Sequence, residues 1–173
     1  IRRGLGLDGV RDIHRIADDV RPFDFIGLNE VGGSDPLFAN QAEAIARLIG
    51  AQWLYAPSEQ RFGRGTHGNA VVTRLPVERW STHPMAKTDP DGYRNFVLTR
   101  MLVDGTPVTV IVTHTDGSED RDDQIRLVFD LFRHWNGPII LMGDLNTREA
   151  HPYVAELLAQ DDVKEPMREM GFE

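Results

Sequence analysis

Two polar residues with the chemistry of a catalytic or metal site follow an apolar run near the C-terminal end of the sequence. Asp144 and Asn146 come after the run 139–142 and Gly143. Such a run predicts a strand buried on both faces, and strand alternation would point both polar side chains the same way. In open α/β sheets, ligands bind at the edge where these residues would lie. Their oxygens could hold a hard cation, a nucleophilic water or a phosphate. The alternative is an Asx turn that caps the next helix.

Polar residues follow two other strand-like runs in the same way. Glu30 stands at the exit of the run 24–30, and His114 and Asp116 follow the run 108–112. One polar residue after a strand is commonplace, but three such strand ends in one small domain favour a functional site. Carboxylate and amide oxygens with one histidine favour Mg²⁺, Mn²⁺ or Ca²⁺ over zinc.

The hydrophobic pattern predicts the elements that would position these residues. Apolar residues with a 3.6-residue period predict helices over 10–20, 37–48, 125–135 and 153–158. Apolar or β-branched runs predict strands over 24–30, 53–56, 69–73, 95–103, 108–112 and 139–142, with a polar loop over 58–68. Asp104-Gly105 lies between two of these runs and indicates a hairpin. Because the hairpin interrupts the alternation of strands and helices, the pattern predicts a mixed sheet or two packed sheets with helices outside.

The composition is that of a soluble globular protein, and we expect residues 1–173 to form a single domain. The chain has no cysteine, which excludes disulfides and thiolate metal sites. No apolar run approaches membrane-spanning length, so we expect a cytoplasmic protein. Because the chain begins at Ile1 and not at Met, secretion stays open. The net charge of −8 argues against a broad basic surface for nucleic acid but is compatible with a local basic cleft or a metal-bridged phosphate.

Five motifs along the chain together resemble a known family. They are, in order, Asp24-Phe-Ile-Gly-Leu-Asn-Glu30-Val31, Gly68-Asn69-Ala70-Val71-Val72-Thr73-Arg74-Leu75-Pro76, Arg94-Asn95, Thr113-His114-Thr115-Asp116 and Gly143-Asp144-Leu145-Asn146. The set is similar to the endonuclease/exonuclease/phosphatase superfamily, the fold shared by DNase I, exonuclease III-type repair nucleases, inositol polyphosphate 5-phosphatases and bacterial sphingomyelinases. A lone Gly-Asp-x-Asn motif is a weak signal, whereas five motifs in the right order along the whole chain are a strong one.

The resemblance implies a DNase I-like four-layer α/β sandwich of two packed mixed sheets flanked by helices. It also implies a metal-dependent phosphohydrolase that cleaves a phosphoester or phosphodiester bond. Glu30 would be the ligand of Mg²⁺ or Mn²⁺. Asp144 would orient or activate the attacking water, and Asn146 would hold water or a phosphate oxygen.

The resemblance assigns the other site residues to the phosphate. His114 would donate a hydrogen bond to the scissile phosphate, Arg94 would neutralise phosphate charge, and Asn69 would bind substrate. The substrate would be a nucleic acid, a phospholipid headgroup or a small phosphate ester, and no stable protein partner is implied.

The sequence departs from the family pattern at three points. Asn29 replaces the usual Gln before the glutamate. The family begins with a strand that ends in a metal-site Asn, and this chain starts just after the place of that strand. The family ends with an Asp-His pair, and no segment after Asn146 matches it; His151, which precedes Pro152, is not assigned to that role. We therefore expect the chain to be truncated at both ends, with the parent protein supplying both segments.

Two other functions compete with this interpretation. A calcineurin-like metallophosphoesterase also uses a Gly-Asp element, but it would need an early Asp-x-His and a late Gly-Asn-His, and neither occurs. A binding module of the same fold that has lost its chemistry is the alternative outside the enzymes.

Overall fold

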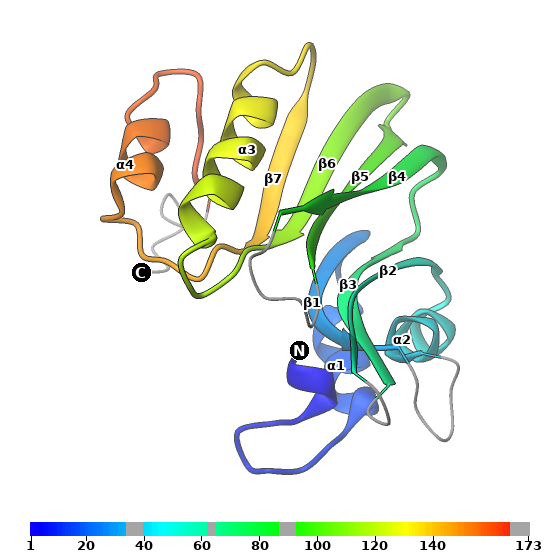
Figure 1. The fold of residues 1–173 in the computed structure, drawn as a ribbon. Helices are drawn as coiled ribbons and strands as arrows, with labels where there is room; N and C mark the ends of the chain where they lie inside the picture. The colour runs from blue at the N-terminus through cyan, green and yellow to red at the C-terminus, as the bar shows by residue number, and fades with distance from the viewer. Residues whose placement is uncertain (34–39, 62–64, 87–92, 167–173) are drawn as a thin grey trace.

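The computed structural model describes residues 1–33, 40–61, 65–86 and 93–166, and Figure 1 shows their arrangement. The strands are β1 (Phe25–Gly32), β2 (Gln52–Arg61), β3 (Gly65–Thr73), β4 (Val77–Met85), β5 (Arg94–Val103), β6 (Thr106–His114) and β7 (Ile139–Asp144). The α-helices are α1 (Ile13–Val20), α2 (Gln41–Ile49), α3 (Arg121–Arg133) and α4 (Pro152–Leu158), preceded by a short 3₁₀ helix, Arg2–Gly4. No helix in these described ranges is long and apolar enough to cross a membrane.

The first sheet is antiparallel, with strand order β1-β3-β2, and its outer face packs against α1 and α2. Strand alternation divides the side chains of β3 between the two faces. Ala70 and Val72 join the cluster with Ala17 and Ile45 of the helices, whereas Val71 faces the second sheet. Each face of β3 therefore meets a different hydrophobic layer, which is the burial expected of a central strand.

The second sheet has the order β4-β5-β6-β7 and is mixed, because β6 and β7 run parallel. Val97, Val110 and Val112 on its inner face pack against Val71 of the first sheet. Ile111 on its outer face packs against α3, and α4 packs beside α3 (Figure 1). Helices, sheet, sheet and helices therefore form four layers, and the predicted DNase I-like α/β sandwich is confirmed.

Local signals correctly located several of the element ends. Asp104 and Gly105 both have positive φ angles, 49° and 78°, as a tight primed turn between β5 and β6 requires. Gly50 ends α2 in the left-handed conformation, close to the predicted end of this helix at residue 48. The predicted beginning of α2 at residue 37 lies outside the described residues, and α2 itself begins at Gln41 after the N-cap Asn40.

Polar strands and element starts were the main errors. Strand β4 was not predicted, because this edge strand is mostly polar and half exposed and contains Pro84, which only an edge tolerates readily. The predicted loop over 58–68 is largely strand, since β2 extends to Arg61 and β3 begins at Gly65. Helix α1 begins at Ile13, where the Asp12 side chain caps it, and not at residue 10.

Strand β7 is only partly buried, in contrast to the prediction of burial on both faces. Ile139 and Leu141 pack toward α3, and Met142 packs toward the first sheet. Ile140 is 46% exposed. Among the described strands β7 pairs only with β6, so it is an edge strand. The first sheet leaves Ile140 uncovered.

Gly143 is the position in β7 where a side chain should be least tolerated. Its φ is 139°, and a Cβ there would lie 1.9 Å from Thr113 O. Gly137 also has a positive φ, 115°, but open space around it. We expect Gly143→Ala to lower the free energy of unfolding by about 3 kcal/mol or more, and Gly137→Ala by about 1–2 kcal/mol, because only the first adds a clash to the backbone cost. Urea denaturation of both variants checks this, and equal losses would contradict it.

Candidate active site

Three of the predicted site residues lie at one end of the two sheets. His114 and Asp144 are Cα partners in the parallel pair β6–β7, so the last residues of these two strands stand side by side. Glu30 comes from β1 of the other sheet. Burial and the Arg94 charge lower the pKa of His114 overall, whereas the carboxylates of Asp144 and Glu30 act to raise it. Both carboxylates are therefore close enough to the ring to interact with it electrostatically.

Asn29 joins the two sheets at this point. Its Nδ2 donates to Thr113 O at 2.9 Å and to Asn69 Oδ1 at 2.8 Å. Its Oδ1 accepts from the backbone N–H of Asp144 at 3.1 Å. One side chain thus fixes β1 against β6 and β7. Sequence reasoning treated Asn29 only as a departure from the family pattern; the signal for its role was its position directly before Glu30.

Asn69 lies behind Asn29 and is buried. It is 1% exposed, and its Nδ2 donates to Asn95 Oδ1 at 2.8 Å and to Asn95 O at 3.0 Å. Asn95 Nδ2 in turn donates to Pro57 O at 2.9 Å. This chain of amides supports Asn29 from within the core. The substrate-binding role of Asn69 stays a prediction, and its burial favours indirect support of the site.

The sequence predicted Glu30 at the exit of its strand, but the residue lies within the strand. Strand β1 continues to Gly32, and Glu30 lies where the register with β3 shifts between Leu28 and Val31. Its φ is 56°, a left-handed conformation uncommon outside glycine. A bulge of this kind turns a side chain out of the strand alternation and is frequent beside active sites. The bulge therefore allows a carboxylate within a strand to face the site.

Asp144 and Asn146 form the Asx turn of the alternative interpretation, but the turn does not cap a helix. Asp144 Oδ1 accepts from the backbone N–H of Asn146 at 2.8 Å, and α4 begins only at Pro152. Asn146 has a φ of 49°. Its Nδ2 lies 3.0 Å from His114 Nε2 and donates to Thr115 O at 2.8 Å. The turn thus brings the Asn146 amide to the histidine, and the functional role of Asp144 and Asn146 stays a prediction.

His114 is 6% exposed and has a donor facing each ring nitrogen. Arg94 Nη1 lies 3.3 Å from Nδ1, and Asn146 Nδ2 lies 3.0 Å from Nε2. A neutral imidazole can accept at one nitrogen, whereas an imidazolium can accept at neither. Burial and then the Arg94 guanidinium lower the pKa of His114 below its ordinary value of 6.5, and the Asp144 and Glu30 carboxylates oppose them only in part. His114 is therefore neutral at pH 7.

Arg94 is held next to the histidine by a buried carboxylate. Its Nε lies 3.7 Å from Asp116 Oδ2, and the Arg94 side chain is 21% exposed. Asp116 Oδ1 accepts from Ser118 N at 3.2 Å, and the Asp116 backbone N–H donates to Gln124 Oε1 of α3 at 2.7 Å. The guanidinium is thus anchored from behind and keeps its positive charge at the site.

The donors around Glu30 suit one hard cation with water ligands. Burial lowers the pKa of the Ile1 amino group overall, and the carboxylates of Glu30 and Asp144 act in the opposite direction. Over the described residues, no group of three or more His, Cys, Asp or Glu could hold a metal ion. Mg²⁺ commonly binds through one or two carboxylates and keeps several waters. Glu30 and Asp144 are the carboxylates here that could hold such an ion, and their role as ligands stays a prediction.

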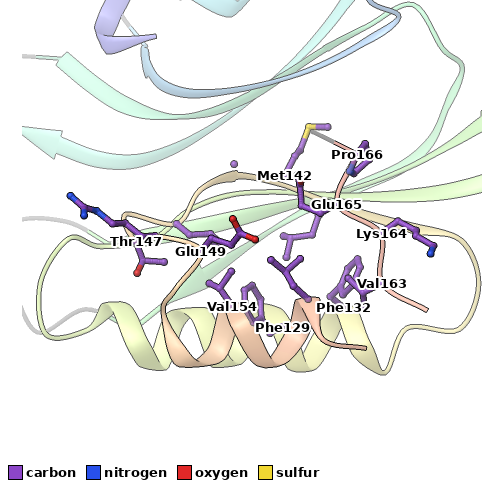
Figure 2. A pocket seen from close by; sticks show the side chains of 15 residues that line it. Phe129, Phe132, Met142, Thr147, Glu149, Val154, Val163, Lys164, Glu165 and Pro166 are labelled. Carbon is purple, nitrogen blue, oxygen red and sulfur yellow. The ribbon is translucent and has the colours of Figure 1, made fainter. Parts of the chain in front are cut away.

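A cavity of about 660 Å³ lies beside this cluster, and Figure 2 shows its lining. Its wall is formed by the end of β7, by α3 and α4, and by residues 163–166, with apolar side chains such as Phe129 and Val154. Met142 and Gly143 line it next to Asp144, but the cavity lining includes none of the predicted site residues Glu30, Asn69, Arg94, His114, Asp144 and Asn146. The cavity is therefore a neighbour of the cluster.

The lowered pKa of His114 predicts how stability depends on pH. As pH falls through 6.5, the unfolded chain binds a proton before the folded ring does, so the free energy of unfolding should decrease until the folded ring also titrates. NMR titration of the metal-free protein measures the pKa of the ring directly. Urea denaturation between about pH 8 and about pH 5 should show a smaller loss of stability for His114→Gln than for wild type. The exposed His14→Gln is the control, and a ring that titrates at or above pH 6.5 would contradict the assignment.

The fold is similar to those of several solved structures. An endonuclease/exonuclease/phosphatase family protein from Leptotrichia buccalis matches with a TM-score of 0.71 and 20% identity, over 91% of this chain and 69% of that one. TDP2 of D. rerio, complexed with a single-strand DNA product, matches with 0.66 and 14% identity, over 93% and 63%. The human nocturnin catalytic domain with a bound sulfate anion matches with 0.66 and 16% identity, over 93% and 66%. The likeness at these identities is one of fold, and this chain spans about two thirds of each structure's length.

Comparison with curated protein sequences gives no match. The sequence profile of the Endonuclease/Exonuclease/phosphatase family, in contrast, matches residues 4–164 and so covers all five motifs and all the candidate site residues. The chain belongs to the endonuclease/exonuclease/phosphatase family.

Proposed function

We propose that this protein is a divalent-metal-dependent phosphohydrolase that cleaves a phosphoester or phosphodiester bond by in-line attack of water. The observation that carries the proposal is the convergence of Glu30, His114 and Asp144 from three strands of two sheets. Family membership supports it, because members are typically hydrolases of phosphoester bonds. Two fold neighbours hold a DNA product and a sulfate anion, respectively, and both ligands are oxyanions.

Asp144 is the candidate for the residue that orients the attacking water. Its side chain is exposed, and Oδ1 accepts the Asn146 backbone N–H at 2.8 Å, which restricts rotation of the carboxylate. The second carboxylate oxygen then faces a defined direction. A carboxylate held within hydrogen-bond reach of a water can take up its proton as attack proceeds.

His114 and Arg94 are the candidates for stabilising charge on the phosphoryl oxygens. A neutral His114 carries one N–H and can donate it to a phosphate oxygen, if either Arg94 or Asn146 turns its own donor toward the substrate as well. The three groups would then present donors and a positive charge to a phosphoryl group. Donors that are fixed before the reaction stabilise developing charge most effectively.

Glu30 is the candidate metal ligand, with Mg²⁺ or Mn²⁺ as the ion. When bound, such an ion would act as a Lewis acid toward a phosphoryl oxygen. The proposal is supported by the bulge at Glu30, which takes this residue out of the regular strand alternation, and by the second carboxylate, Asp144, in the same electrostatic neighbourhood. The fold does not determine whether the substrate is a nucleic acid, a phospholipid headgroup or a small phosphate ester.

Hydrolysis should depend on the added metal. We expect cleavage of bis(p-nitrophenyl) phosphate by the purified protein with Mg²⁺ or Mn²⁺, loss of the activity with excess EDTA, and recovery when the metal is restored, because Glu30 needs a cation beside it to act on phosphate. Absorbance of released nitrophenolate measures the rate. Full activity in excess EDTA would overturn the metal requirement.

Glu30→Gln and Asp144→Asn should separate metal binding from turnover. We expect Glu30→Gln to weaken metal binding at least about tenfold, because it removes a charged ligand. We expect Asp144→Asn to lower kcat by about 10²–10⁴-fold with a smaller effect on metal affinity, because it removes the base. Calorimetric metal titration and steady-state kinetics distinguish the two, with the exposed helical variant Asp19→Asn as the matched loss of a carboxylate. Turnover of Asp144→Asn within a few-fold of wild type would refute its role.

A further inference from the structure

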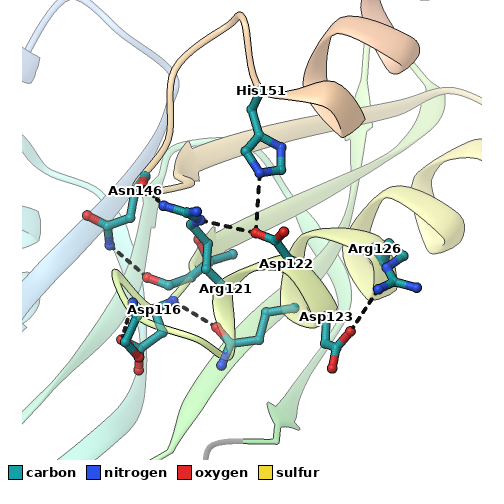
Figure 3. Close-up of polar contacts among 10 residues, drawn as sticks. Asp116, Arg121, Asp122, Asp123, Arg126, Asn146 and His151 are labelled. Carbon is teal, nitrogen blue, oxygen red and sulfur yellow. Dashed lines mark hydrogen bonds and ion pairs between the residues drawn. The ribbon is translucent and has the colours of Figure 1, made fainter.

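The loop between β7 and α4, residues 145–151, is attached at two points to two consecutive residues at the start of α3 (Figure 3). Near its beginning, Arg121 Nη1 donates to the carbonyl oxygen of Asn146 at 3.3 Å. At its end, His151 Nε2 lies 3.2 Å from Asp122 Oδ1. The first attachment is to a residue of the candidate active site, and the second closes the loop against the same helix.

Asp122 holds the two attachments together. Its Oδ1 lies 3.3 Å from Arg121 Nε and 3.2 Å from His151 Nε2, so one oxygen receives both donors. Asp122 lies in the first turn of α3, where the helix dipole favours a carboxylate. Arg121 is thus held by its neighbour in the orientation that directs its Nη1 to Asn146.

Asn146 needs such support to keep its place beside His114. Its φ of 49° is a less favourable region even for asparagine, so neighbouring contacts must maintain it. Two of these contacts, with Asp144 Oδ1 and Thr115 O, come from the strand ends themselves. Arg121 supplies the contact that comes from a helix, and it acts on the backbone carbonyl of Asn146.

His151 is the least exposed member of this network, at 12%, whereas the side chains of Arg121 and Asp122 are 31% and 46% exposed. Ion pairs at this level of exposure contribute little to the free energy of folding. A contact that matters little for folding but fixes a strained residue of the site acts mainly on the geometry of that site.

We propose that Arg121 and Asp122, with His151, are positioning residues that hold the 145–151 loop so that the Asn146 amide faces His114. This inference rests on the proposed function for its catalytic consequence. The positioning itself is a property of the fold and can be measured without substrate.

The test compares Arg121→Ala with Arg126→Ala. Arg126 lies on the same helix, pairs with Asp123 at 3.1 Å and lies 5.2 Å from the centroid of the Tyr153 ring; within the described part of the chain, neither of these contacts is with Arg121, Asp122 or Asn146. We expect Arg121→Ala to lower kcat about tenfold with KM within about twofold, Arg121→Lys to restore part of the loss, and added guanidinium to restore part of it in Arg121→Ala. Arg126→Ala should leave kcat unchanged. A structural role alone would not produce rescue or a change confined to kcat.

A second measurement needs no activity. We expect the imidazole ¹⁵N signals of His114 to shift in Arg121→Ala and Asp122→Ala, and to stay unchanged in Arg126→Ala, because only the first two release the Asn146 amide. If wild type proves inactive while the signals shift, the proposed function fails and the positioning role stands. If the His114 signals and kcat of Arg121→Ala both match those of wild type, the positioning role is overturned.

Discussion

The hydrogen bonds of the half-buried Asn29 side chain are the interactions on which the candidate site depends. Its amide bonds to Thr113 O and Asn69 Oδ1, and its carbonyl oxygen accepts from Asp144 N. The bonds to Thr113 and Asp144 cross from β1 to the second sheet, so they hold the two sheets in register at the site. An amide that is withdrawn from water is costly unless its groups are paired, and it therefore specifies one relative position of the sheets more strictly than apolar packing does. Because Glu30 is the next residue in the chain, the hydrogen bonds of Asn29 also fix the position of its backbone.

The electrostatic character of the site depends on the Asp116 carboxylate, which holds Arg94 beside His114. The whole chain has a net charge of −8, but Arg94 is anchored at the site by Asp116 and lies against His114. Burial of the ring and the Arg94 guanidinium beside it lower the pKa of His114 and so favour a neutral histidine. The site thus combines two carboxylates, which could hold a cation, with a guanidinium and an amide, which could contact a phosphoryl group.

The sequence by itself determined the elements and the positions of the polar residues. Hydrophobic periodicity located most strands and helices, and Asp104-Gly105 located a hairpin, because these signals act between residues close in the chain. The same local pattern placed His114 and Asp144 after apolar runs, and their pairing in the parallel sheet follows from the topology. The polar edge strand β4 was missed because its burial depends on one neighbour and not on its own composition.

Only the tertiary structure decided how these residues meet. The bulge at Glu30 arises from the pairing of β1 with β3, residues about 40 positions apart in the chain. The exposure of Ile140 depends on where the first sheet ends, and the hold of Arg121 on Asn146 joins a helix to a loop 25 residues away. Local sequence preferences do not predict such contacts, because each contact forms only after distant segments have packed. The free energy of that packing also outweighs the backbone strain at Glu30 and Asn146.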